Sequence, residues 1–75
     1  MDYIREAAFE LRMSQRQLAK TLEVSEQALR NYRMGKQSLP VKLCVQIEQM
    51  TGGKITRKQL RQDWAELWPE LGEQA

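Results

Sequence analysis

The sequence predicts a compact all-α domain of four to five short helices. Apolar residues recur at helical spacing, first in the set Ile4, Ala7, Ala8 and Leu11. The hydroxyl residues Ser14 and Thr56 are each followed three positions later by glutamine, which is the spacing of a helix capping box. No pair of alternating stretches indicates two paired strands. We therefore expect a single domain over residues 1–71 and a frayed tail over residues 72–75.

Start and stop signals place the helices in chain order. Asp2 is suited to cap the first helix, and Pro40 fits the first turn of the fourth. Gly35 and the pair Gly52–Gly53 are typical helix stops. The expected helices cover about residues 3–13, 15–22, 26–34, 40–50 and 57–61, with one more turn over residues 64–68.

The stretch from Gln15 to Gly35 has the spacing of two helices joined by a tight turn at residues 23–25. The small Ala19 lets the two helices cross closely, and the hydroxyl of Ser25 can accept a free backbone N–H of the second helix. The inward positions are Leu18, Ala19, Leu22, Val24, Leu29 and Tyr32. This pattern predicts a helix-turn-helix, a motif that places its second helix in the major groove of DNA.

At these residues the chain resembles the phage repressor and Cro class of regulators. The later run IEQMTGGKITRKQLRQD resembles the YdaS-like Cro branch of bacterial prophages, first labelled as antitoxins, and the two segments together cover roughly residues 12–71. The resemblance implies a lambda-repressor-like fold and a repressor acting in the bacterial cytoplasm, at the nucleoid. The chain departs from the family at Gln62, where proline is usual, and at Glu23, where many relatives have glycine. A side chain at position 23 must avoid positive φ or carry its energetic cost.

Composition argues against several classes of protein. There is no histidine, and the one cysteine, Cys44, lies in an apolar stretch, so we expect no metal, no cofactor and no enzyme activity. No apolar run approaches the roughly 20 residues of a membrane helix, and the charged start is unlike a signal peptide, so we expect a cytoplasmic protein. No small-molecule pocket is evident.

Charge is distributed unevenly, although the formal net charge is only +2. Residues 12–42 carry seven cations against two carboxylates, and residues 54–61 carry four cations and no carboxylate. Residues 62–75 carry four carboxylates and no cation. The two positive stretches predict a phosphate-binding surface separate from an acidic end, and a solubilising surface of mixed charge is the alternative.

One set of residues is expected to contact DNA phosphates. Gln15 begins a helix whose free N–H groups favour a phosphate, and Arg16 lies beside it. The resemblance places further phosphate contacts just after the recognition helix. The set is Gln15, Arg16, Arg33, Lys36, Gln37 and, as an addition, Lys42.

A second set, on the outward face of the recognition helix, is expected to read bases. Helical spacing exposes four of its members, and the resemblance brings Ser25 and Ala28 within reach of a base or a phosphate. The set is Ser25, Glu26, Gln27, Ala28, Arg30 and Asn31. Gln27 and Asn31 can each bridge adenine N6 and N7, arginine can fork onto guanine, and glutamate can accept from cytosine N4. Two other roles for Glu26 stay open, namely exclusion of wrong sequences and orientation of Arg30.

One such helix reads about four or five base pairs, so we expect a homodimer on a pseudo-palindromic operator with half-sites ~34 Å apart. The candidate contact surface is an apolar stripe at helical spacing, formed by Trp64, Leu67, Trp68 and Leu71. Two interpretations are open. The stripe folds onto the chain's own core, or it meets another copy or another protein.

Three functions follow from these patterns. The leading hypothesis is a sequence-specific repressor that covers a promoter operator in double-stranded DNA. The second is an antitoxin or adaptor that binds a protein partner through the Trp64–Leu71 face. The third is nonspecific nucleic-acid binding through the basic surface, which depends on salt and not on sequence.

Overall fold

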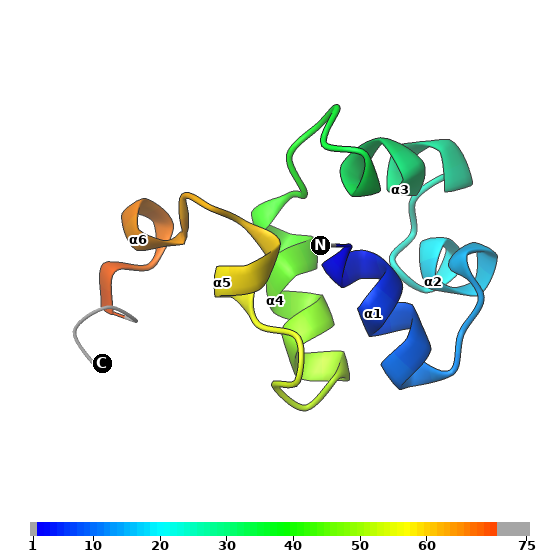
Figure 1. Cartoon of the computed structure of the whole chain (residues 1–75), viewed down its shortest axis with the longest axis horizontal. Helices are drawn as coiled ribbons and strands as arrows, with labels where there is room; N and C mark the ends of the chain where they lie inside the picture. Colours follow the sequence, from blue (N-terminus) through cyan, green and yellow to red (C-terminus); the bar gives the residue numbers. More distant parts are fainter. Residues whose placement is uncertain (1, 71–75) are drawn as a thin grey trace.

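A computed structural model describes residues 2–70, and all the regular structure in that range is helical. Six helices follow one another (Figure 1): α1 Tyr3–Leu11, α2 Gln15–Thr21, α3 Glu26–Arg33, α4 Val41–Met50, α5 Arg57–Leu60 and α6 Trp64–Leu67. The all-α class is confirmed, and the expected last turn forms the sixth helix. The longest of these helices has ten residues, so none in the described range could cross a membrane. The expected tail over residues 72–75 lies outside the described residues.

Side-chain caps fix where most of the helices begin. Ser14 and Thr56 both form the predicted capping box: each hydroxyl accepts the backbone N–H three residues ahead, and the glutamine there accepts the N–H of the capping residue. Asp2 and Ser25 each accept the backbone N–H three residues ahead, at 2.9 Å and 3.0 Å. These bonds satisfy N–H groups that a helix start leaves without a partner, so the starts follow from local chemistry.

Some boundaries differ slightly from the expected ones. α1 ends at Leu11, before the expected residue 13, because Arg12 takes a left-handed backbone conformation with φ 57°. Pro40 is the N-cap of α4 and not its first residue. Both shifts leave the order of the helices unchanged.

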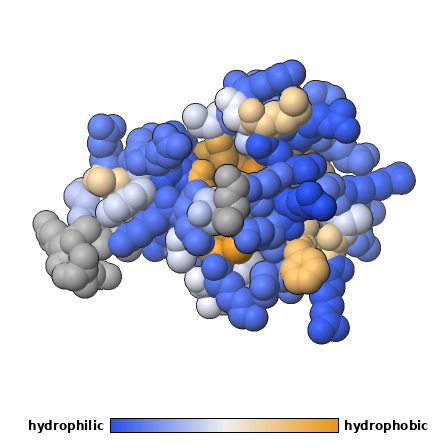
Figure 2. Space-filling view, viewed as in Figure 1, coloured by the Kyte–Doolittle hydropathy of each residue, from blue (hydrophilic) through white to orange (hydrophobic). Residues whose placement is uncertain are grey.

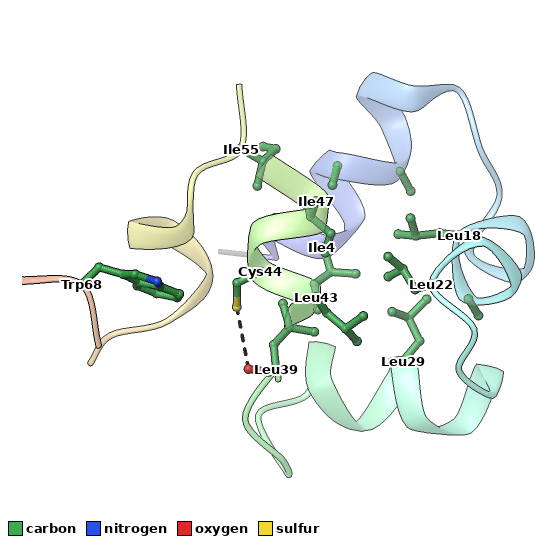
Figure 3. Packing of buried hydrophobic residues seen from close by; sticks show 13 residues of the cluster. Ile4, Leu18, Leu22, Leu29, Leu39, Leu43, Cys44, Ile47, Ile55 and Trp68 are labelled. Atoms are coloured by element: carbon green, nitrogen blue, oxygen red, sulfur yellow. Dashed lines mark hydrogen bonds between the residues drawn. The ribbon is translucent and has the colours of Figure 1, made fainter. Parts of the chain in front are cut away.

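A single apolar core lies between the helices. Its buried members are Ile4, Ala7, Ala8, Leu18, Ala19, Leu22, Leu29, Leu39, Leu43, Cys44, Ile47, Ile55 and Trp68 (Figure 3). The inward positions predicted around the turn all belong to this cluster or pack against it. Cys44 is a core residue, as predicted, and desolvation by burial raises the pKa of its thiol to about 11. At neutral pH the thiol therefore stays protonated and behaves as a small apolar group.

The C-terminal tryptophans do not form the continuous helical stripe that the sequence predicted. α6 ends at Leu67, and Trp68 leaves the helical conformation with φ −134° and ψ 69°. The Trp68 side chain is 9% exposed and points toward Cys44 of α4 (Figure 3), and Trp64 packs against the same core. Leu67 is 38% exposed, and Leu71 lies outside the described residues. Both tryptophans therefore fold onto the chain's own core, which was one of the two open interpretations.

Candidate nucleic-acid interface

Helices α2 and α3 are joined by residues 22–25, on the side of the molecule away from α6 (Figure 1). The turn closes through backbone hydrogen bonds, from the N–H of Glu23 to the Lys20 carbonyl at 3.1 Å and from the N–H of Val24 to the Ala19 carbonyl at 2.9 Å. Glu23 has φ 60°, so the chain takes the left-handed conformation that a glycine would adopt more easily. The turn thus keeps its shape in spite of the departure from glycine.

Helix α3 has one buried and one solvent-facing side. Leu29 is 1% exposed and Tyr32 packs against the core, whereas Glu26, Gln27 and Arg30 stand in solvent. Hydrophilic side chains dominate the visible surface around α2 and α3 (Figure 2). The remaining members of the base-reading set lie on the same stretch: Ser25 exposed, and Ala28 and Asn31 partly exposed. The structure therefore brings all six candidates together along one helix.

Two amide side chains on this face are hydrogen-bonded to each other. Gln27 Nε2 donates to Asn31 Oδ1 at 3.1 Å, one helical turn away. The spacing i, i+4 is the sequence signal for such a bond, which the prediction of two separate base readers did not include. Within residues 2–70, Glu26 forms no ion pair, so the orienting contact with Arg30 is not seen.

A cleft of about 290 Å³ connects the start of α2 with α3. Its lining residues are Gln15, Glu26, Gln27, Leu29, Arg30 and Arg33. The Oε1 atom of Gln15 is buried here and has no hydrogen-bond partner among the described residues. The cleft therefore places two predicted phosphate contacts, Gln15 and Arg33, next to three of the predicted base readers.

The other predicted phosphate contacts differ in how free they are. Four of them are exposed: Arg16, Lys36, Gln37 and Lys42. Within the described part of the chain, the three cations among these four form no ion pair. Arg33 instead donates from Nε to Asp2 Oδ2 at 2.9 Å, with the two side chains 28% and 32% exposed. The partners are 31 positions apart, so no local pattern in the sequence pointed to this pair.

Cations of the positive stretch over residues 54–61 form ion pairs within the chain. Lys54 pairs with Glu10 at 3.1 Å, and Arg57 pairs with Glu48 at 2.8 Å. The sequence predicts a phosphate-binding surface for this charge. Lys54 connects the loop before α5 to α1, and Arg57 connects α5 to α4.

The last two cations of the stretch hold the C-terminal segment. Arg61 binds Asp63 through Nε and Nη2, at 2.8 Å and 2.9 Å, and donates from Nη1 to the Leu39 carbonyl. The hydrogen bond from Arg61 lowers the pKa of the Asp63 carboxyl and raises the pKa of Arg61 itself. Lys58 lies over the ring of Trp64, 4.5 Å from its centroid, a cation–π contact. Asp63 is therefore engaged by Arg61 and does not cap α6 with its side chain.

A second, polar cleft of about 410 Å³ was not predicted. It opens between the start of α1, the loop after α3 and the α5–α6 segment, and its rim includes the Asp2–Arg33 and Arg61–Asp63 pairs. In residues 2–70 no group of three or more histidine, cysteine, aspartate or glutamate side chains is arranged to hold a metal ion.

The chain matches the model of one known protein family over residues 6–67, and that family is described as bacterial toxin YdaS. The chain belongs to this family. The YdaS match spans α2, the turn and α3, and thus contains nearly all of the surface described above. The family description names a toxin, whereas the resemblance had suggested an antitoxin label. No curated protein and no solved structure matches the chain.

Proposed function

We propose that this YdaS-family chain is a sequence-specific DNA-binding regulator, in which α2 and α3 act as a helix-turn-helix and α3 enters the major groove. One observation carries the proposal: α3 buries Leu29 at 1% exposure and presents Glu26, Gln27 and Arg30 to solvent. These are side chains that can bond to base edges, and a helix held by its core face can place them in a groove without unfolding.

The distribution of free charge supports the same surface. Arg16 and Lys20 on α2, Arg30 on α3 and Lys36 after it are exposed, and within the described residues they form no ion pair. The cations of residues 54–61 are in contact with groups of the chain itself. Exposed cations without an ion pair in residues 2–70 thus include this group at α2, α3 and the following loop, and Arg5, Arg12 and Lys42 elsewhere; the proposal uses the first group to attract phosphates.

We further propose that the chain acts without catalysis or a cofactor, as a Cro-like repressor in the bacterial cytoplasm. One copy of α3 spans only about four or five base pairs, so two copies would read the half-sites of a pseudo-palindromic operator. Trp68 lies in the core and Trp64 packs against it, so neither ring is available to join two copies. The two copies would then contact each other through another surface, or would be held together only by binding to the same DNA.

The test begins with selection of binding sequences from a random duplex library, followed by fluorescence anisotropy with the selected duplex and a shuffled one. We expect Gln27→Ala and Arg30→Ala each to cost roughly 1–3 kcal/mol at one base position and to relax the preference there. Gln49→Ala, which removes an exposed amide from α4, is the matched control and should change nothing. Equal affinity for both duplexes, lost together as salt is raised, would contradict the proposal.

A second candidate is a toxin or antitoxin module that acts through a protein partner. The family description favours it, and so does the 38% exposure of Leu67 beside the docked tryptophans. Growth arrest on induced expression in bacteria separates the two candidates. Arrest that survives Gln27→Ala with Arg30→Ala, and that is lost in Leu67→Asp, would favour the protein partner. Arrest that disappears with the α3 substitutions would favour action on DNA.

A further inference from the structure

We propose that Gln27 and Asn31 act as one unit that recognises a single adenine, with Gln27 in contact with the base and Asn31 as its positioning residue. This differs from the expectation that each amide reads a base of its own. The inference rests on the proposed function, because α3 must lie in the major groove for either residue to reach a base.

The hydrogen bond between the two side chains decides what Gln27 can offer. Its amide has two N–H donors and one acceptor oxygen, and one donor is used on Asn31 Oδ1 at 3.1 Å. One N–H and the Oε1 atom remain on the same planar amide, and Gln27 is exposed to solvent. Adenine presents an N6 donor next to an N7 acceptor, which is the complement of that pair, whereas guanine presents two acceptors at this edge.

The same bond limits what Asn31 can do. Its Oδ1 is the acceptor on the side chain and already faces Gln27, so its Nδ2 donors are what it can direct elsewhere. Asn31 is also less exposed than Gln27. Holding the Gln27 amide before DNA arrives reduces the side-chain freedom that binding would otherwise remove, and it fixes which edge of the amide faces the groove.

The experiment measures affinity for the selected duplex and for its single base-pair variants, using wild-type protein, Gln27→Ala, Asn31→Ala and the double variant. The preference is the ratio of affinities for the selected duplex and for a duplex changed at one base pair. We expect each single variant to lower this ratio about tenfold at the same A·T pair. The double variant should be no worse there than Gln27→Ala, because the two side chains act together. Asn31→Asp keeps the acceptor oxygen and should keep the adenine preference, although its charge will weaken binding to all duplexes.

A readout without DNA tests the bond directly. In the free protein, Asn31→Ala should shift the side-chain amide resonances of Gln27 and increase their mobility, while those of Gln49 stay unchanged. If Asn31→Ala relaxes the preference at a different base pair, Asn31 reads its own base and the inference is overturned, although DNA recognition stands. If the wild-type protein selects no sequence, the inference and the proposed function both fail.

Discussion

Glu23 carries a conformational cost at the tightest point of the α2–α3 connection. Its φ of 60° lies in the left-handed region, where a Cβ atom approaches the following carbonyl oxygen. The backbone bonds of the turn, from the N–H groups of Glu23 and Val24 to carbonyls of α2, hold the residue there. Strain at this position is therefore local and can be removed without changing the turn.

We expect Glu23→Gly to be more stable than Glu23→Ala by about 1 kcal/mol, because only glycine relieves the left-handed strain. The alanine variant is the matched control, since both substitutions remove the same carboxylate. Urea denaturation followed by circular dichroism gives the two free energies of unfolding. Equal stability of the two variants would show that the turn changes its backbone conformation when the side chain is removed.

At the scale of elements, Asp2 connects two helices that bear on the proposed interface. One carboxylate oxygen caps α1 by accepting the N–H of Arg5, and the other accepts from Arg33 at the end of α3. A partly exposed pair of this kind contributes little to stability. The pair occupies Arg33, a predicted phosphate contact, so Asp2 should compete with DNA for this cation.

We expect Asp2→Ser to release Arg33 while keeping α1 capped, because serine is also a good N-cap. Binding to DNA should tighten at low salt, and the slope of log affinity against log salt should steepen by about 0.9, equivalent to one added phosphate contact. Glu6→Ser is the control, since it removes an exposed carboxylate from the same helix. The same steepening in the control would attribute the effect to net charge alone.

At the scale of the whole molecule, the C-terminal segment completes the core. Trp68 is buried against α4, and the guanidinium of Arg57 lies 5.2 Å from the centroid of its ring. Arg61 ties the same segment to the Leu39 carbonyl, at the loop that precedes α4. Cationic and aromatic side chains that looked like parts of two binding surfaces thus hold α5 and α6 against the rest of the domain.

We expect Trp68→Ala to lower the free energy of unfolding by about 3–5 kcal/mol, the usual loss for a buried tryptophan. The exposed Leu67→Ala should change it by no more than about 0.5 kcal/mol. The free energies of unfolding are measured by denaturation at two protein concentrations. A loss of packing within one chain lowers the free energy of unfolding equally at both concentrations, whereas loss of an interface between copies does not. If Trp68→Ala left the denaturation midpoint unchanged and lowered the molecular mass of the species in solution, Trp68 would instead belong to an interface between copies.

The features that the sequence predicts correctly are those set by residues close to one another in the chain. The starts at Ser14 and Thr56 were predictable because a capping box is made by residues three positions apart. The division of α3 into two faces was predictable for the same reason, since helical spacing alone separates Leu29 from Arg30. The bond between Gln27 and Asn31 has the same local origin and was missed only because each amide was considered by itself.

The all-α class, the capped helix starts and the solvent-facing side chains of α3 follow from the sequence, because each depends on residues only a few positions apart. Which charged side chains and aromatic rings are left free to bind a partner depends instead on the tertiary structure. Lys54 meets a carboxylate 44 positions away, and Arg33 meets one 31 positions away. Ion pairs and core packing depend on distance in space, so partners this far apart in the chain meet only in the folded domain, even where an exposed pair adds little to stability.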